Sequence, residues 1–199
     1  MILFEQRINN AVIFTNRLFA CFAQPSMKIL AISGSLREGS SNHNILKYLS
    51  TLVPDTVDYQ IYKYLANIPA FDPGLDNDTP PPSVRQLRET LAQSDAVIIC
   101  TPEYAFGVPG QLKNMLDWLV SSSSLVDKPV MLITASSQGK YAHESLQLTL
   151  GALTAKLADE TNLLIPFIRS KMDGEGNIVD EEVRKSLDKA FNTFINGIT

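Results

Sequence analysis

Short apolar runs alternate with longer amphipathic stretches from Met27 to the end of the chain. The compact apolar runs predict β-strands at residues 29–32, 57–62, 96–101, 129–134 and 163–165. Apolar positions at helical spacing predict helices at residues 42–52, 84–92, 111–120, 144–157 and 181–195. Residues 66–83 are rich in Pro, Asp and Gly, so they are expected to form an irregular loop.

Strands that alternate with helices predict an α/β domain with a parallel sheet and helices on both faces. The run at residues 96–101 is apolar almost throughout, which is typical of a strand covered on both faces. We expect a doubly wound five-stranded parallel sheet in the order 2-1-3-4-5. Ligands of such sheets bind beyond the carboxyl ends of the strands, here between strands one and three.

Composition excludes several classes of function. The chain has 199 residues, which suits one domain, and its formal net charge of −4 comes without a basic run. A nucleic-acid partner is therefore not expected. Cys21, Cys100 and the two histidines match no metal-ligand spacing, so no metal site is expected. Cys100 ends an apolar run and is interpreted as a small buried hydrophobe.

The first 26 residues stand apart from this pattern. Asn16 and Arg17 interrupt their apolar stretches, so none is long enough to span a bilayer and no membrane partner is expected. Residues 18–21 weakly suggest a lipoprotein cleavage site, but Glu5 and the broken apolar region argue against a secretion signal. Met27 offers an alternative start. We therefore expect residues 1–26 to be an extension outside the core, residues 27–199 to be the domain, and the location to be cytoplasmic.

The loop after the first strand has the composition of a phosphate cradle. It reads Gly34-Ser-Leu-Arg-Glu-Gly-Ser-Ser-Asn42. Its glycines allow close approach of an anion, its Ser and Asn side chains donate, and the next helix presents its positive end. Arg37 can bind two phosphate oxygens. The alternative is a polar strand-to-helix turn with Ser41 or Asn42 as N-cap. The glycine spacing matches neither a Walker A motif nor the dinucleotide fingerprint.

The loop after the third strand can form a platform for a flat ring. It reads Thr101-Pro-Glu-Tyr-Ala-Phe-Gly-Val-Pro-Gly110. Two prolines and two glycines fix its path, so that backbone N–H groups can meet the carbonyl edge of a heterocycle. Tyr104 and Phe106 add aromatic surface. The alternative is that both aromatic side chains pack against the sheet.

Residues 34–42 and 101–118 together resemble the NADPH-dependent FMN reductase family, which includes flavin, quinone, chromate and azo-dye reductases. The second segment continues as Pro109-Gly-Gln-Leu-Lys-Asn-Met-Leu-Asp-Trp118, and residues 68–73 are similar to the family's short loop after strand two. The resemblance covers residues 28–195. It implies a flavodoxin-like fold, FMN as cofactor, and NADPH or NADH as hydride donor. It also implies a small-molecule acceptor such as a quinone or free flavin.

The resemblance assigns roles to particular residues. The FMN phosphate is expected to contact Ser35, Arg37, Ser40 and Asn42. The isoalloxazine ring is expected to contact Pro102, Glu103, Tyr104 and Ala105, mainly through backbone groups. Ser136 and Ser137 match the third flavin-facing loop. Because flavin N5 carries the hydride chemistry, no protein residue is expected to be catalytic. Glu103 is interpreted as structural rather than as a general base.

Two departures from the family pattern affect these expectations. Ala105 stands where an asparagine is common, which removes one polar contact. Residues 140–144, Lys-Tyr-Ala-His-Glu, stand where members carry a glycine pair and an arginine. Nicotinamide access, acceptor choice and subunit packing are therefore left open, whereas the flavin site is expected to survive. His143 is interpreted as a solvent-facing residue near a helix start rather than a proton donor.

Two other functions remain open at this point: a non-enzymatic electron carrier of the flavodoxin kind, and a flavin-bound regulatory protein. Arg37 argues against the carrier, because flavodoxins typically cradle the phosphate with hydroxyl and backbone groups. The resemblance also implies a homodimer or homotetramer, with residues 112–119 as a contact surface. Trp118 extends that apolar helix, although packing against its own sheet explains it nearly as well.

Overall fold

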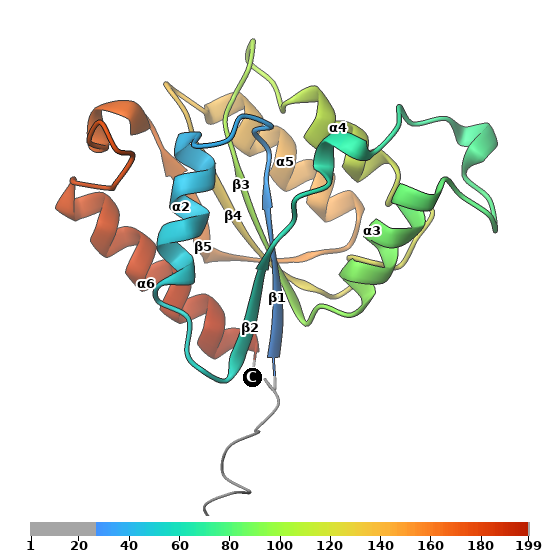
Figure 1. Cartoon of the computed structure of the whole chain (residues 1–199), viewed down its shortest axis with the longest axis horizontal. Helices are drawn as coiled ribbons and strands as arrows, with labels where there is room; N and C mark the ends of the chain where they lie inside the picture. Colours follow the sequence, from blue (N-terminus) through green and yellow to red (C-terminus); the bar gives the residue numbers. More distant parts are fainter. Residues whose placement is uncertain (1–26, 199) are drawn as a thin grey trace, which may run out of the picture.

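The structure, a computed structural model, describes residues 27–198 and contains the expected five-stranded parallel sheet in the order β2-β1-β3-β4-β5 (Figure 1). The strands are β1 (Met27–Ser33), β2 (Val57–Ile61), β3 (Ala96–Thr101), β4 (Pro129–Ala135) and β5 (Lys156–Ile165). The helices are α2 (Ser41–Ser50), α3 (Pro82–Ala92), α4 (Gly110–Asp117), α5 (Lys140–Ala152) and α6 (Glu181–Ile198). Residues 1–26, predicted to be an extension, lie outside the described part. Within residues 27–198, no helix has the length and apolar character that crossing a membrane requires.

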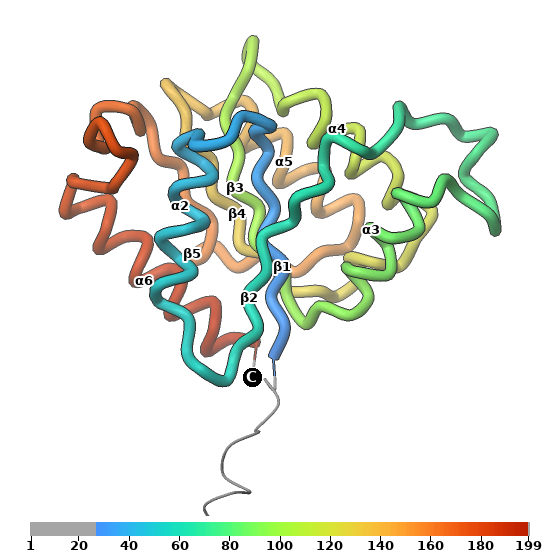
Figure 2. The backbone as a smooth tube through the Cα atoms, in the orientation of Figure 1, coloured from blue at the N-terminus to red at the C-terminus, as the bar shows by residue number. Residues whose placement is uncertain are grey.

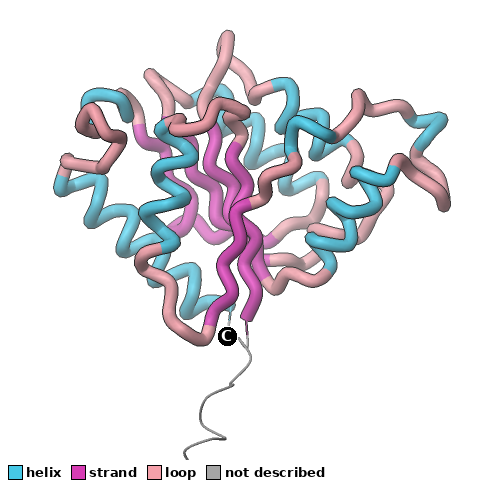
Figure 3. Tube along the Cα trace, viewed as in Figure 1, coloured by secondary structure: helices cyan, strands magenta, loops and turns pink. Residues whose placement is uncertain are grey.

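Helices cover both faces of the sheet, with α2 and α6 on one side and α3, α4 and α5 on the other (Figure 3). Successive side chains of a strand point to opposite faces. Val97 and Ile99 therefore pack toward α3, α4 and α5, whereas Ile98 and Cys100 pack toward α2 and α6. Cys100 is fully buried, as predicted, and this burial raises the pKa of its thiol. The thiol is therefore protonated at neutral pH.

The predicted boundaries of α5 and β5 were wrong. Helix α5 begins at Lys140 rather than Glu144, and it ends at Ala152 because Thr154 adopts a left-handed conformation with φ 55°. Strand β5 begins at Lys156 rather than Leu163. Residues 158–161 bulge from the ladder, because Leu157 pairs with Val130 and Asn162 pairs with Leu132. The polar residues of this bulge interrupt the apolar pattern, so the pattern does not indicate the part of β5 that precedes Leu163.

The irregular loop at residues 66–83 contains two short 3₁₀ helices, η1 (Leu65–Asn67) and η2 (Pro73–Leu75). Polar side chains of α4 hold this loop through its backbone. The Gln111 side chain donates to the carbonyl oxygens of Leu65 and Ile68, both at 2.8 Å. Asn114 accepts the N–H of Phe71 at 2.7 Å. The loop is therefore fixed against the helix that follows the ring-platform loop.

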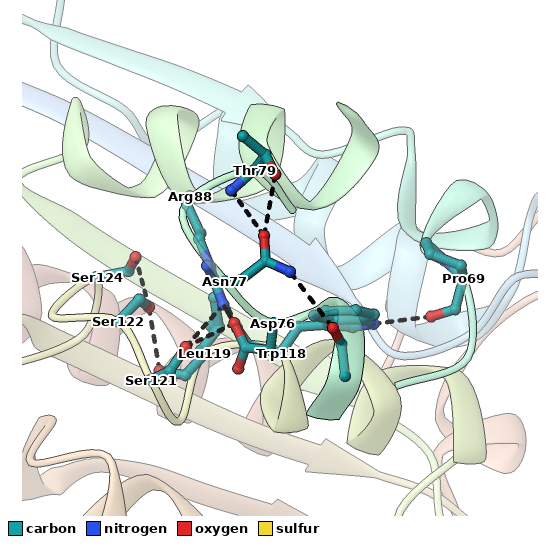
Figure 4. Close-up of polar contacts among 11 residues, drawn as sticks. Pro69, Asp76, Asn77, Thr79, Arg88, Trp118, Leu119, Ser121, Ser122 and Ser124 are labelled. Carbon is teal, nitrogen blue, oxygen red and sulfur yellow. Dashed lines mark hydrogen bonds and ion pairs between the residues drawn. The ribbon is translucent and has the colours of Figure 1, made fainter. Parts of the chain in front are cut away.

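Trp118 and Arg88 add further polar contacts to this loop (Figure 4). The Trp118 indole N–H donates to the carbonyl oxygen of Pro69 at 2.8 Å, and Arg88 donates to the Trp118 carbonyl oxygen. Arg88 also forms an ion pair of 2.7 Å with Asp76. The apolar residues of the predicted contact helix are all buried in the chain's own core: Leu112, Met115, Leu116, Trp118 and Leu119. Of the two readings of Trp118, packing against its own domain is the one observed.

Candidate functional site

The loops after β1, β3 and β4 lie together at the carboxyl edge of the sheet (Figure 2). Residues of these loops line a cavity of about 620 Å³. Its size falls within the usual range of small-molecule sites. All but one of the residues expected to contact FMN line it: Ser35, Arg37, Ser40, Asn42, Pro102, Glu103, Tyr104, Ser136 and Ser137. Ala105 is not among the lining residues. The structure thus brings together three loops that are far apart in sequence.

The first loop leads into the N-terminus of α2. Ser40 is the N-cap, because its Oγ accepts the N–H of His43 at 3.2 Å; the alternative caps Ser41 and Asn42 lie inside the helix. The first N–H groups of a helix have no intrahelical partner, so this end of α2 presents donors at the cavity. The guanidinium of Arg37 forms no ion pair within residues 27–198. An exposed, unpaired arginine beside a helix N-terminus is a favourable environment for an anion.

Asn42 is oriented by a contact beneath the cavity. Only 3% of the residue is exposed, and its Oδ1 accepts the thiol S–H of Cys100 at 3.4 Å. Because burial keeps this thiol protonated, Cys100 acts as the donor of the pair. The amide N–H₂ of Asn42 is then the group left to donate toward the cavity.

The second loop forms a tight hairpin with a strained tip. Tyr104 and Gly107 exchange backbone hydrogen bonds of 3.0 and 2.9 Å. Between them, Ala105 and Phe106 both adopt left-handed conformations, with φ 49° and 60°. Asparagine tolerates this conformation better than alanine, so Ala105 adds backbone strain. Phe106 is 70% exposed and stacks edge-on against Tyr141 at 5.4 Å. The alternative that Tyr104 and Phe106 pack on the sheet is wrong, since both are exposed.

Glu103 caps helix α5 from outside that helix. The N-cap of α5 is Gly139, which has no side chain to satisfy the first N–H groups. The Glu103 carboxylate accepts the N–H of Gly139 at 3.2 Å and that of Ala142 at 3.0 Å. A carboxylate at a helix N-terminus is stabilised by the helix dipole. The structural role predicted for Glu103 is confirmed: it joins the second loop to the helix that follows the third.

The third loop is also joined to the second through Ser136. Its Oγ accepts the N–H of Glu103 at 3.1 Å, and this hydroxyl lies 3.4 Å from the Glu103 carbonyl oxygen. Ser137 is exposed and also lines the cavity. The cavity wall is therefore a connected set of loops.

His143 lies near the start of α5, as predicted, but the prediction that it faces solvent was wrong. It lies half-buried in α5, with Nδ1 2.9 Å from Oγ1 of Thr134 in β4. Burial lowers the pKa of its imidazole, and the opposing effect of the Glu144 charge is smaller. His143 does not line the cavity. Its contact with Thr134 gives it a packing role between α5 and the sheet.

The free energy of unfolding is expected to decrease as the pH is lowered, and His143 is expected to cause part of this decrease. Because its pKa is lower in the folded state, the unfolded state binds more protons below the ordinary histidine pKa of about 6.5. The free energy of unfolding should therefore decrease as the pH falls from 7.5 to 5.5. Urea denaturation at these two values should show a smaller decrease for His143→Gln than for the wild type. If the free energy of unfolding decreases equally in His143→Gln and in the wild type, the His143 imidazole does not contribute. His43→Gln serves as a comparison variant, because burial also lowers the pKa of His43.

A fourth wall of the cavity was missed by the sequence analysis. It consists of Phe167, Ile168, Arg169 and Ser170, which follow β5. They lie at the carboxyl end of a parallel strand, as the other three loops do. The same strand-end reasoning, applied to the fifth strand, would have included them.

Comparison with known proteins adds independent findings. Residues 27–168 match the family model for NADPH-dependent FMN reductase. The chain is 31% identical to the NADH:(hydroxy)cinnamate reductase subunit CrdA of Vibrio ruber, over 85% of this chain and 86% of that one. It is 30% identical to a quinone reductase of Escherichia coli K12, over 86% and 97% of the two chains. Among solved structures, the flavoenzyme NAD(P)H:(acceptor) oxidoreductase FerB of Paracoccus denitrificans superposes with a TM-score of 0.75 at 26% identity, covering 86% and 97% of the chains.

Proposed function

This chain belongs to the NADPH-dependent FMN reductase family, and from that premise we propose that the cavity at the carboxyl edge of its sheet binds FMN. Family membership makes the protein a flavin-dependent oxidoreductase that takes electrons from NADH or NADPH. We propose a quinone, free flavin or similar small molecule as the electron acceptor.

The observation that carries the FMN site is the set of donors at the N-terminus of α2. Arg37 is unpaired within the described residues, Ser40 caps the helix, and Asn42 is held with its amide N–H₂ available. Together they fit a phosphate group, which favours several donors and a positive charge. In this proposal these three residues and Ser35 hold the FMN phosphate.

The second and third loops supply the surroundings of the flavin ring. We assign Pro102, Glu103 and Tyr104 to one side of the ring, with Ser136 and Ser137 beyond them. Ala105 contributes to the path of the hairpin rather than to the cavity wall. FMN supplies the hydride and electron transfer when it is bound. The protein residues hold the cofactor and fix the spacing of the loops around it.

Arg37→Ala is expected to weaken FMN binding by about 1.5–3 kcal/mol, because a charge-assisted contact to the phosphate is lost. This corresponds to roughly a 10- to 150-fold higher dissociation constant. Riboflavin, which lacks the phosphate, should bind the variant and the wild type equally. Fluorescence titration of the apo-protein with both flavins measures this difference. If wild-type protein binds FMN and riboflavin equally, the phosphate site is not where we place it.

Steady-state kinetics test the reductase function. A single cavity that serves donor and acceptor in turn predicts a ping-pong mechanism. Double-reciprocal plots with NAD(P)H varied at several quinone concentrations should then give parallel lines. Intersecting lines would show that both substrates bind together. Absence of turnover, with FMN bound, would favour an electron carrier or a flavin-bound regulatory protein instead.

The cytoplasmic location, the homodimer or homotetramer, and the division at residues 26 and 27 are also proposals. The oligomer rests on family membership alone. Its predicted contact through α4 lacks support, because the apolar side chains of that helix lie in the core of the same chain. Any contact through α4 would have to use its polar side.

A further inference from the structure

The loop after β5 forms a fixed wall of the cavity. Its Phe167 N–H donates to the carbonyl oxygen of Ser137, and its Ile168 N–H donates to that of Ser136, both at 3.2 Å. The Ile168 side chain is buried in the core. These contacts hold the loop against the third loop of the proposed FMN site. The residues on either side of Ile168 are left at the cavity.

The backbone of this wall is strained. Phe167 adopts a left-handed conformation with φ 54° and ψ 35°, although it is neither glycine nor asparagine. Such a conformation is unfavourable for a residue with a Cβ, and residues that retain it concentrate at binding and catalytic sites. Phe167 is also 62% exposed, so burial of its ring does not explain the strain. The strained turn leads directly into η3 (Ile168–Lys171), which carries Arg169 to the cavity.

The charges that line the cavity are unbalanced. Arg37 and Arg169 both line it, and neither forms an ion pair within residues 27–198. Among residues 27–198, Glu103 is the one acidic residue that lines the cavity, and its two carboxylate oxygens accept the backbone N–H groups of Gly139 and Ala142 at the start of α5. Two arginines therefore line the cavity without an ion-pair partner in the described part of the chain. A phosphate monoester, which carries about −1.5 to −2 charges at pH 7, matches them.

We propose that Arg169 is a second phosphate-binding residue of this cavity, on a different loop from Arg37. The inference rests on the proposed function and extends it to a residue of another loop. The ligand is a phosphoryl group, presented either by FMN or by the nicotinamide dinucleotide. FMN is the first expectation, because Arg169 shares one cavity with Ser40 and Asn42 at the N-terminus of α2. Two arginines supply the geometry and charge that a dianionic phosphate favours.

The test compares Arg169→Gln with Arg85→Gln. Arg85 is an exposed arginine on α3 that does not line the cavity, so it controls for loss of one positive charge. Apo-protein is titrated with FMN and with riboflavin, and flavin fluorescence reports binding without any turnover. Arg169→Gln should weaken FMN binding at least tenfold and leave riboflavin binding unchanged. Arg169→Lys, which keeps the charge, should recover part of the loss.

Steady-state kinetics with the two donors identify the source of the phosphoryl group. If FMN binding is unchanged, a higher KM for both NADH and NADPH assigns Arg169 to the pyrophosphate. A higher KM for NADPH alone assigns it to the additional phosphate of that donor. The inference is overturned if Arg169→Gln stays within twofold of Arg85→Gln for both flavins and both donors. Wild-type protein that binds FMN no better than riboflavin would overturn the proposed FMN site as well.

Discussion

Gly34→Ala is expected to destabilise the protein by about 3 kcal/mol, because the added methyl group has no space. A Cβ at this position would lie 2.2 Å from Oγ1 and 2.7 Å from Cβ of Thr101. Thr101 is fully buried in the sheet, and the Gly34 N–H donates to the carbonyl oxygen of Cys100 at 2.8 Å. Neither Gly34 nor Thr101 can therefore shift to make room for the methyl group. Urea denaturation of the apo-protein measures the loss.

The close approach of Gly34 to Thr101 also joins the first two loops of the site, because each loop starts at one of these residues. Gly34→Ala should therefore lose FMN affinity as well as stability. Gly110→Ala is the matched control, since a Cβ there meets no atom of residues 27–198 within 4 Å. It should be neutral or stabilising by up to about 1 kcal/mol. If the two variants unfold at the same urea concentration, the first two loops are not packed as described.

Glu103→Ala is expected to destabilise the apo-protein by about 2 kcal/mol, because it removes two hydrogen bonds at the start of α5. Ala142 is buried, so its N–H would lose its partner without gaining water. The second loop would also lose its connection to α5. We therefore expect the dissociation constant of FMN to rise at least tenfold. Urea denaturation and flavin titration measure the two effects separately.

Two further variants distinguish this cap from a general effect of negative charge. Glu103→Gln keeps one acceptor oxygen and should lie between the wild type and Glu103→Ala. Glu144→Ala removes an exposed carboxylate of the same helix, whose contact with Lys140 is a surface ion pair of 3.9 Å. It should change stability by less than about 1 kcal/mol. A Glu144→Ala effect as large as that of Glu103→Ala would contradict the capping role.

The sheet and three walls of the cavity follow from local patterns. The runs that form β1 and β3 end in Ser33 and Thr101, where the polar loops begin, and parallel pairing aligns Ser33 with Cys100. Strand ends that lie in register place their loops together. This is why the positions of Arg37 and Glu103 at one cavity are predictable without a structure.

The remaining features depend on contacts between distant residues. Glu103 binds N–H groups 36 and 39 residues later in the chain, and nothing near Glu103 indicates these partners. Phe167 adopts a left-handed conformation, which a glycine or asparagine at that position would have indicated and a phenylalanine does not. His143 is half-buried because α5 begins earlier than its apolar pattern suggests. Tertiary packing determines each of these features, and the helical or strand periodicity of apolar residues does not indicate them.

The most direct test of FMN-dependent reductase activity is an anaerobic half-reaction. FMN-bound protein is mixed with NADH or NADPH while the visible absorbance of the flavin is followed. We expect at least one donor to bleach the flavin, and a quinone added afterwards to restore its absorbance. A flavin that stays oxidised with both donors would contradict the function proposed for this protein.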